Sequence, residues 1–453
     1  MELKTKDLVL RPIRLGDEEQ IHEYAGDNEI TMMFWLPNDT FEETCDFVRH
    51  CDEDWKKPFE QIEDYEFVIT LDGKIIGGCD CDLSHSEDHT YATLGWIINK
   101  NYRGRGFASQ AGAALIDFAF NNLKIERILA QCDCKNAASF GVMKKIGMRC
   151  IDDKGTRTYP KTGITSGEYT CQITRTEWKL NIRSEQPEDF HNTEHMTMRS
   201  FWNKYYPGCV EHNMLRVIRE SADYLPEISR VAELDGKIVG AAFYTKAWIV
   251  GEDGMRHEVA MLGPLAVEPT LEGNNIGGAL ISETIHLAKE AGIAGIILCG
   301  EPGYYPKFGF KLMQDFGITD VGGNSYDAYL CYPLSEDFTR YKGHFEESPD
   351  FEKIEDPAAL EKISKEFPAY RKVKVQEGFM QIFNQHLGLV ESVEGEVFNV
   401  RYWELVIPCK LAEGLEQRPV AGSDVQFIWN HKGGESKITK VFKNLLDDEE
   451  SVR

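Results

Sequence analysis

The chain has 453 residues, of which 42% are hydrophobic and 28% charged, which is the balance of an ordinary globular protein of two or three domains. No apolar run has the length of a membrane span, and the first residues lack the apolar segment of a signal peptide. The formal net charge of −25 disfavours non-specific binding to nucleic acid or anionic membranes and favours cationic partners such as amines.

Twelve cysteines are scattered along the chain, which predicts reduced thiols in a cytoplasmic protein rather than a disulfide framework. Two Cys-Asp-Cys triplets, at residues 79–81 and 132–134, would place both thiols on one face of a strand, where they could hold a soft metal. Neither triplet has the Cys-x-x-Cys spacing of a structural zinc site. We therefore predict half-buried thiols and no metal.

The first part of the chain predicts alternating strands and helices. Residues 3–14 alternate in polarity as a strand does, and residues 18–24 and 40–55 have the apolar spacing of helices. Residues 65–82 predict a hairpin around an Asp-Gly pair, a dipeptide that favours a tight turn between antiparallel strands. These elements lead into the most informative stretch, residues 93–148.

This stretch combines an apolar strand over residues 94–98, a basic glycine-rich turn and an amphipathic helix. The turn is Arg103-Gly104-Arg105-Gly106-Phe107-Ala108. Free backbone N–H groups and the helix dipole both point at such a turn, and glycine lets the backbone approach an anion closely. No Gly-Lys-Ser/Thr of a Walker loop follows, and the G-x-G-x-x-G spacing is missing. The turn therefore predicts a phosphate-binding loop of another kind.

A second strand over residues 127–132 leads to Asn136 and Ser139 at the start of a further helix. The pattern Arg-x-x-Gly-x-Ala after one strand, with Asn-x-x-Ser after the next, resembles the acetyl-CoA-binding core of the GNAT N-acetyltransferases, and within them the RimJ/RimL branch. The resemblance implies an α/β (α+β) fold with a mixed, splayed sheet flanked by helices. It also implies acetyl-CoA as co-substrate and no metal.

A linker is predicted at residues 181–190, after which the same layout recurs in a diverged form. A hairpin over residues 228–244, a strand over 258–267, a turn over 269–278 and a helix over 279–291 follow in that order. The segments LGPLAVEP and GEPGYYPKFGF resemble the YhbS-like branch of the GNAT proteins. This second resemblance implies a second fold of the same kind.

The chain thus resembles two GNAT domains in tandem, over residues 1–182 and 190–350, followed by a module over 356–446 that matches neither branch. Strand patterns in this module indicate a small β-barrel. They cover residues 398–411, 424–430 and 436–442, with helix patterns at 357–367 and 378–389. Its aromatic residues could stack on nucleic-acid bases, but the module is not basic, so core packing is the favoured interpretation. These residues are Tyr402, Trp403, Phe427 and Trp429.

The resemblance implies a set of acetyl-CoA-binding residues in each half. In the first half they are Ile97, Ile98, Arg103, Gly104, Arg105, Gly106, Phe107, Ala108, Asn136 and Ser139. In the second half they are Leu265, Val267, Gly273, Asn275, Gly277 and Gly278. Glu272 stands where the family has glutamine or arginine, and Asn275 replaces a glycine. Because asparagine tolerates a left-handed backbone, we expect the second turn to survive.

Acetyl transfer by direct attack of an amine on a thioester needs a base for the amine and an acid for the departing thiolate. In the first half Ser139 is the candidate acid. However, Thr93 stands where many relatives carry a strand glutamate, and Met143 stands where others carry an acid tyrosine. The base must come from elsewhere, and the candidate carboxylates are Glu66, Asp80, Asp82, Asp133 and Glu168.

In the second half the candidate acid matches the family pattern better than the cofactor-binding turn does. Tyr305 lies in a Tyr-x-Lys-x-Gly-Phe pattern. The resemblance to the GNAT proteins implies that this pattern places an acid tyrosine beside the CoA sulfur. Tyr304 is expected to line the same pocket. Glu258 is the candidate base and Glu301 is a further option. The first half therefore has the better cofactor turn, and the second half has the better acid.

Together these patterns predict an N-acetyltransferase that moves an acetyl group from acetyl-CoA to a primary amine in a ternary complex. The acceptor is expected to be a small-molecule amine, a protein N-terminus or a lysine, with no membrane or nucleic-acid partner. The alternative is an acyl-CoA-binding regulatory or scaffold protein in which one or both GNAT domains are catalytically degenerate.

Overall fold

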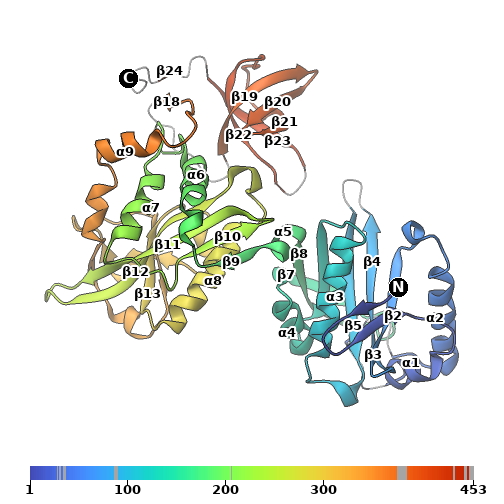
Figure 1. Cartoon of the computed structure of the whole chain (residues 1–453). Helices are drawn as coiled ribbons and strands as arrows, with labels where there is room; N and C mark the ends of the chain where they lie inside the picture. Colours follow the sequence, from blue (N-terminus) through green and yellow to red (C-terminus); the bar gives the residue numbers. More distant parts are fainter. Residues whose placement is uncertain are drawn as a thin grey trace. The chain divides into compact units, whose positions relative to one another are not determined.

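The computed structural model describes residues 1–453 except residues 28, 30, 31, 34–36, 86–89, 206, 375–384, 432, 433, 443–445 and 448–453. The chain divides into two compact units, Met1–Trp178 and Lys179–Arg453 (Figure 1). Among the described residues, no helix is both long and apolar enough to cross a membrane.

The first unit is an eight-stranded sheet with helices on both faces (Figure 1). Its strand order is β1-β2-β3-β4-β5-β6-β8-β7, with β5 and β6 parallel and the other neighbours antiparallel. The strands are β1 (Leu3–Lys4), β2 (Val9–Pro12), β3 (Asp64–Leu71), β4 (Lys74–His85), β5 (Thr90–Ile98), β6 (Arg127–Asp133), β7 (Arg149–Thr158) and β8 (Thr165–Thr174). The helices are α1 (Glu18–Ala25), α2 (Phe41–Asp54), α3 (Phe107–Asn121), α4 (Ala137–Lys145) and α5 (Arg175–Lys179).

Strand β3 shows why helices cover both faces of this sheet. Alternate residues of a strand point to opposite faces. Tyr65 and Phe67 accordingly pack in the core that contains Leu115 and Phe118 of α3, whereas Val68 packs in the core of α1 and α2. Burying one such side chain contributes about 1.5–3 kcal/mol. The central strands are therefore held between two apolar layers, which keeps the site they carry in place.

The predicted hairpin turns are confirmed. Asp72 and Gly73 have φ of 50° and 82°, and Asp235 and Gly236 have φ of 48° and 78°. Two consecutive left-handed residues form the turn whose twist matches that of the flanking strands. The predicted first strand, in contrast, is two short strands, β1 and β2.

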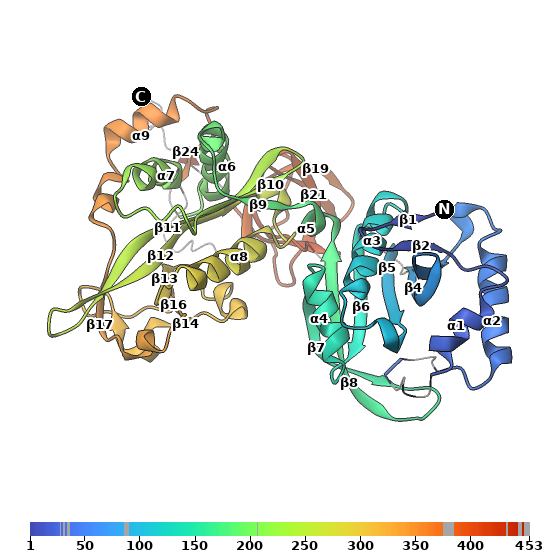
Figure 2. The same cartoon turned by 60° about the horizontal axis from the view of Figure 1, so that its bottom comes forward.

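The second unit begins with a nine-stranded sheet (Figure 2). The main path of this sheet is β14-β16-β13-β12-β11-β10-β9, and β17 pairs with both β11 and β15. The strands are β9 (Asn181–Arg183), β10 (Arg230–Leu234), β11 (Lys237–Val250), β12 (Arg256–Val267), β13 (Gly295–Cys299), β14 (Lys311–Leu312), β15 (Ile318–Thr319), β16 (Tyr329–Pro333) and β17 (Gly343–Glu346). Strand β9 lies in the segment that the sequence indicates as a linker.

Helices α6 (Phe190–Phe201) and α7 (Glu211–Glu220) cover one face of this sheet, and α8 (Ile276–Glu290) covers the other (Figure 2). Leu215 and Ile218 of α7 pack with Phe243 of β11, whereas Leu280 of α8 packs with Tyr244, its neighbour in sequence. The two faces again follow from the alternation along a central strand.

The C-terminal module is a closed barrel with the strand order β19-β20-β21-β23-β22, which confirms the predicted β-rich module. Its strands are β19 (Gln385–Glu394), β20 (Val397–Tyr402), β21 (Leu405–Leu411), β22 (Asp424–Ile428) and β23 (Ser436–Val441). Short strands β18 (Val373–Lys374) and β24 (Leu446–Asp447) pair with each other, and α9 (Pro357–Ser364) precedes them.

Two predictions for this module have different outcomes. The helix predicted over residues 378–389 is wrong for residues 385–389, which belong to β19, and its remainder lies outside the described residues. Core packing of the aromatic residues is confirmed for Phe427, which is fully buried, and for Tyr402 and Trp429, which pack against that core.

Candidate acetyl-CoA sites

The turn between β5 and α3 has the backbone geometry of an anion-binding loop. Gly104 and Gly106 have φ of 78° and 80°, a left-handed conformation in which glycine carries no steric penalty. Gly106 is the N-cap of α3. Because glycine has no side chain, it cannot accept hydrogen bonds from the first backbone N–H groups of the helix. Helix dipole and free amides together favour an anion at this turn.

The first turn is also open. A β-carbon placed on Gly104 would meet nothing within 4 Å among the described residues. A β-carbon on Gly106 would meet Lys145 Nζ at 3.8 Å. Lys145 lies at the end of α4, and its exposed ammonium group adds positive charge beside the turn. Nothing in the local sequence pattern indicates this residue, because it reaches the turn from a separate helix.

The two arginines of the turn differ in their contacts. Arg103 Nε donates to the carbonyl oxygen of Ile98 at 2.9 Å, which ties the turn to the end of β5. Arg105 is exposed, and its guanidinium lies 5.8 Å from the centroid of the Tyr102 ring. Both remain on the solvent side of the turn, where they can contribute charge.

Beside this turn the central strands separate. Strands β5 and β6 pair only at Ala92 with Ile128 and at Thr93 with Leu129, although β5 continues to Ile98. Beyond Thr93 the strand is paired only with β4 among the described residues. The segment with Ile97 and Ile98 therefore borders a gap between parallel strands, as the splayed sheet predicts.

The second pair of predicted cofactor residues has a structural role. Asn136 Oδ1 accepts the backbone N–H of Ser139 at 3.0 Å and so caps α4. Ser139 is half-buried in the first turn of this helix. Met143 is buried in the core. Asn136 thus orients α4, and its contact with a cofactor stays a prediction.

Two of the five candidate carboxylates are already engaged. Asp133 accepts the Tyr159 hydroxyl at 2.6 Å and the Ser166 hydroxyl at 3.1 Å. Glu168 forms an ion pair of 2.6 Å with Arg157, and both side chains are buried. The hydrogen bonds from Tyr159 and Ser166 outweigh the effect of burial and lower the pKa of Asp133, so its carboxylate accepts a proton less readily. The ion pair with Arg157 holds the Glu168 side chain in place. These contacts argue against both residues as bases.

The other three carboxylates form an acidic cluster of Glu66, Asp80 and Asp82 on β3 and β4. Glu66 is paired with Asp80, and Asp82 is paired with Thr93 of β5, the position where relatives carry a glutamate. Burial, followed by the neighbouring carboxylates, raises the pKa of Asp80 to about 8 and raises the pKa of Glu66. Burial and Asp64 raise the pKa of Asp82 to about 6.

Asp80 occupies the best position of the three. Its carboxylate accepts the Gly95 backbone N–H, and its Oδ1 lies 2.3 Å from where a β-carbon on Gly95 would stand. Gly95 is in the part of β5 that has separated from β6. A half-buried carboxylate with a pKa of about 8 suits a general base, because it both loses and accepts a proton near neutral pH.

The turn before α8 has the same backbone geometry in the second unit. Gly273 and Asn275 have φ of 82° and 59°, and Asn275 is the N-cap of α8. The left-handed asparagine confirms that the turn survives the loss of its glycine. Strands β12 and β13 also separate, since they pair only at Ala260 with Ile296 and at Met261 with Ile297.

Unlike the first turn, the second is covered by side chains. A β-carbon on Gly273 would lie 2.4 Å from His431 Cβ, and one on Gly277 would lie 2.5 Å from the Tyr304 hydroxyl. A β-carbon on Gly278 would lie 2.3 Å from Asn275 Oδ1. The backbone is shaped for a phosphate, but neighbouring side chains stand over it.

The strand residues beside this turn already have contacts within the protein. Val267 N–H donates to Ser200 Oγ at 3.3 Å, so one predicted cofactor-binding amide already has a partner. Leu265, the other strand residue of the predicted set, is half-buried and packs against the core.

The predicted catalytic residues of the second unit lie in different surroundings. Tyr305 packs against Tyr304 and Phe310, with ring centroids 5.2 and 5.6 Å apart, and burial raises its pKa. A protonated phenol suits a proton donor. Glu258 is exposed at the start of β12 and forms an ion pair of 3.1 Å with Lys246. That setting lacks the burial that prepares a base, so the geometry does not support Glu258 in this role.

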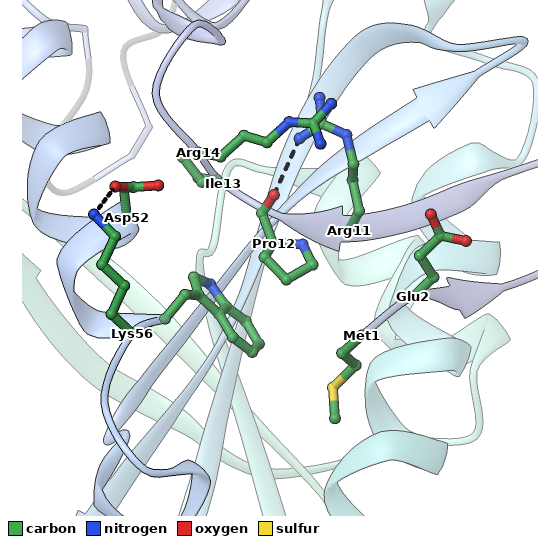
Figure 3. A pocket seen from close by; sticks show the side chains of 9 residues that line it. Met1, Glu2, Arg11, Pro12, Ile13, Arg14, Asp52 and Lys56 are labelled. Carbon is green, nitrogen blue, oxygen red and sulfur yellow. Dashed lines mark hydrogen bonds and ion pairs between the residues drawn. The ribbon is translucent and has the colours of Figure 1, made fainter.

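The first unit also has a surface hollow of about 350 Å³ beside β2 (Figure 3). Figure 3 shows the Lys56 ammonium pointing at Asp52, and the two form an ion pair. Arg11, also in its lining, is held by Asp17 at 2.8 Å. Arg14, which also lines the hollow, is exposed to solvent. The hollow lacks the glycine-rich backbone of the first turn, so we do not assign it a phosphate-binding role.

Each of the two sheets has parallel central strands that separate beside a left-handed turn, and a helix follows the turn. Residues 7–149 match the acetyltransferase (GNAT) domain, and residues 195–310 match the acetyltransferase (GNAT) family. The chain is 31% identical over 180 residues to an uncharacterised N-acetyltransferase of Bacillus subtilis, YnaD, which covers 39% of this chain and 99% of that protein. The chain belongs to the GNAT acetyltransferases and is an acyltransferase.

Two further similarities involve one enzyme and one solved structure. Spermidine N(1)-acetyltransferase of Escherichia coli is 25% identical over 141 residues, covering 30% of this chain and 70% of that enzyme. The crystal structure of the GNAT protein YhbS of Escherichia coli in complex with CoA matches with 22% identity and a TM-score of 0.35, covering 38% of this chain and 92% of that one.

Proposed function

We propose that the protein transfers an acetyl group from acetyl-CoA to a primary amine and that the first unit carries the reaction. The observation that supports this most directly is the open left-handed turn at Gly104 and Gly106 beside the separated strands β5 and β6. Its free amides, Arg105 and Lys145 would hold the pyrophosphate of acetyl-CoA.

In this proposal Asp80 is the general base and Ser139 donates a proton. The carboxylate of Asp80 takes a proton from the amine as the nitrogen attacks the thioester carbonyl. The carbon–nitrogen bond forms, the carbon–sulfur bond breaks, and the thiolate receives a proton through the Ser139 hydroxyl. Water replaces the proton on Ser139, and Asp80 releases the proton that it took to water, so the protons balance. No covalent enzyme intermediate is required.

We propose a cationic amine as the acceptor, with the reaction in the cytoplasm. The acidic cluster and the net charge of −25 favour a substrate that carries positive charge. One relative is a spermidine acetyltransferase, which fits a small polyamine-like acceptor. A protein N-terminus or lysine is the other acceptor class.

The covered turn of the second unit supports a non-catalytic role for that unit. Its fold is retained, but His431 and Tyr304 stand over the cradle. We propose that it acts as a structural or regulatory partner of the first unit.

Calorimetric titration with acetyl-CoA, combined with a thiol-release assay over a panel of amines, tests these proposals. We expect one tight acetyl-CoA site per chain and thiol release with cationic amines. Binding without thiol release for any amine would favour the CoA-binding scaffold instead. Release driven only by neutral amines would contradict the acceptor class.

A further inference from the structure

A group of three potential metal ligands lies between the barrel and the covered turn of the second unit. The group consists of Glu272, His386 and His431, whose ligand atoms all lie within 4.8 Å of one another. Glu272 precedes α8, His386 is in β19, and His431 follows β22. Three elements that are distant in sequence thus direct metal-binding side chains to one point.

His386 carries the strongest signal. Its side chain is only 8% exposed, and its Nε2 has no hydrogen-bond partner among the described residues. Nε2 instead faces Glu272 Oε2 at 3.5 Å. A buried polar atom without a partner is costly, and a native structure that keeps one calls for an explanation such as an ion.

We propose that Glu272, His386 and His431 form a binding site for a divalent transition metal of the zinc type. Two imidazoles and one carboxylate suit Zn²⁺ better than Mg²⁺ or Ca²⁺, which prefer oxygen ligands alone. Ligands about 2.0 Å from a tetrahedral zinc lie about 3.3 Å apart, close to the separation of His386 Nε2 and Glu272 Oε2. A fourth position is left for water.

The surroundings match those of a metal centre. The His386 ring is enclosed by aromatic side chains, with its centroid 4.8 Å from that of Tyr402 and 5.5 Å from that of Phe427. The Tyr402 hydroxyl hydrogen-bonds to Glu272, as outer-shell groups do for ligating carboxylates. Trp429 packs against His431 with ring centroids 4.0 Å apart and limits its orientation.

A second contact holds the barrel near this turn. The Arg199 guanidinium pairs at 2.7 Å with Glu268, just before the turn, and at 2.7 Å with Glu404 of the barrel. It also lies 4.4 Å from the centroid of the Trp403 ring. A metal at the proposed site would complete this attachment and fasten the barrel over the turn. It would also neutralise Glu272, the carboxylate that replaces a cofactor-binding side chain.

The test is a metal titration of the full chain. After treatment with a chelator and loading with Zn²⁺, we expect one zinc per chain by elemental analysis. Glu272→Gln and His431→Ala should each weaken zinc binding by more than about 100-fold, since first-shell losses exceed outer-shell ones. The matched control is His286→Gln, an exposed histidine of α8, which should bind zinc as the wild type does.

Two further readouts separate this site from the cysteine thiols and from misfolding. Co²⁺ in place of zinc should give the visible bands of a tetrahedral site without a thiolate charge-transfer band. Zn²⁺ should raise the melting temperature of the wild type but not that of Glu272→Gln, whose melting without metal is measured alongside. Absence of zinc in the loaded wild type, or equal retention in all variants, would overturn the proposal.

Discussion

The two turns that precede α3 and α8 have nearly the same backbone and very different access. Gly104 and Gly106 in the first correspond to Gly273 and Asn275 in the second, with left-handed φ at all four positions. The first turn is open except for Lys145, whereas His431 lies directly on Gly273. Backbone shape alone therefore does not make a cofactor site, because side chains from other elements decide whether a ligand can enter.

The largest expected effect is in the open turn. Gly106→Glu places a side chain on a left-handed residue and a negative charge where the pyrophosphate would bind. We expect acetyl-CoA binding to the first unit to be lost in calorimetric titration. Gly163→Glu, at another exposed left-handed glycine of the same unit, is the matched control and should retain binding. Unchanged stoichiometry in Gly106→Glu would contradict the cradle assignment.

The next effect concerns the base. Asp80→Asn should lower kcat about 100-fold, the usual contribution of a positioned base, with little change in acetyl-CoA affinity. Because the pKa of Asp80 is raised to about 8, its carboxylate form increases as pH rises, so the wild-type rate should climb from about pH 6 to about pH 9.

This rising limb should disappear in Asp80→Asn, whereas Asp117→Asn on the exposed face of α3 should leave it intact. The cluster titrates as a coupled unit, so the limb reports Glu66 and Asp82 as well. A rate that is flat over this pH range in the wild type would remove Asp80 from the mechanism.

A smaller loss is expected at Lys145. Lys145→Ala removes the ammonium group beside Gly106 and should weaken acetyl-CoA binding about tenfold, the value of one charge-assisted contact. The adjacent Lys144, which lies 4.3 Å from the centroid of the Phe140 ring, provides the control. Equal affinities of Lys144→Ala and Lys145→Ala would show that the Lys145 ammonium group does not contact the cofactor.

Opening the second turn should have a modest effect in the opposite direction. His431→Gly removes the side chain that lies on Gly273. With a chelator present, we expect a second, weak acetyl-CoA site to appear in calorimetric titration, while Glu272 and Tyr304 still disfavour the ligand. If the wild type already binds two equivalents of acetyl-CoA, the conclusion that only the first turn admits the cofactor is wrong.

The smallest effect is expected at Tyr305. If the first unit is the catalyst, Tyr305→Phe should change kcat by less than about twofold, because its hydroxyl lies in the other unit. A loss of about tenfold or more in steady-state turnover would move the reaction to the second unit.

Much of the fold could be predicted from the sequence because it depends on local preferences. The Asp-Gly hairpins, the left-handed Asn275 and the barrel strands follow from which backbone conformations each residue tolerates and from the period of apolar side chains. Local rules failed for residues 385–389, where strand pairing in the barrel overrides a helical pattern.

The candidate site was predictable only in part. The sequence offers five candidate carboxylates for the base and does not distinguish between them. In the structure Asp133 contacts Tyr159 and Glu168 contacts Arg157, so the acidic cluster contains the remaining candidates. Those partners come from β7 and the segment after it, so only packing of the sheet brings them together.

By itself, the sequence determined the family, the repeated strand–turn–helix layout and the left-handed turns, because these are encoded by neighbouring residues. Only the tertiary structure decided that Lys145 reaches the first turn and that His431 covers the second. The tertiary structure also places Glu272 Oε2 3.5 Å from His386 Nε2. Contacts between distant segments depend on how whole elements pack, and no local pattern of residues specifies them.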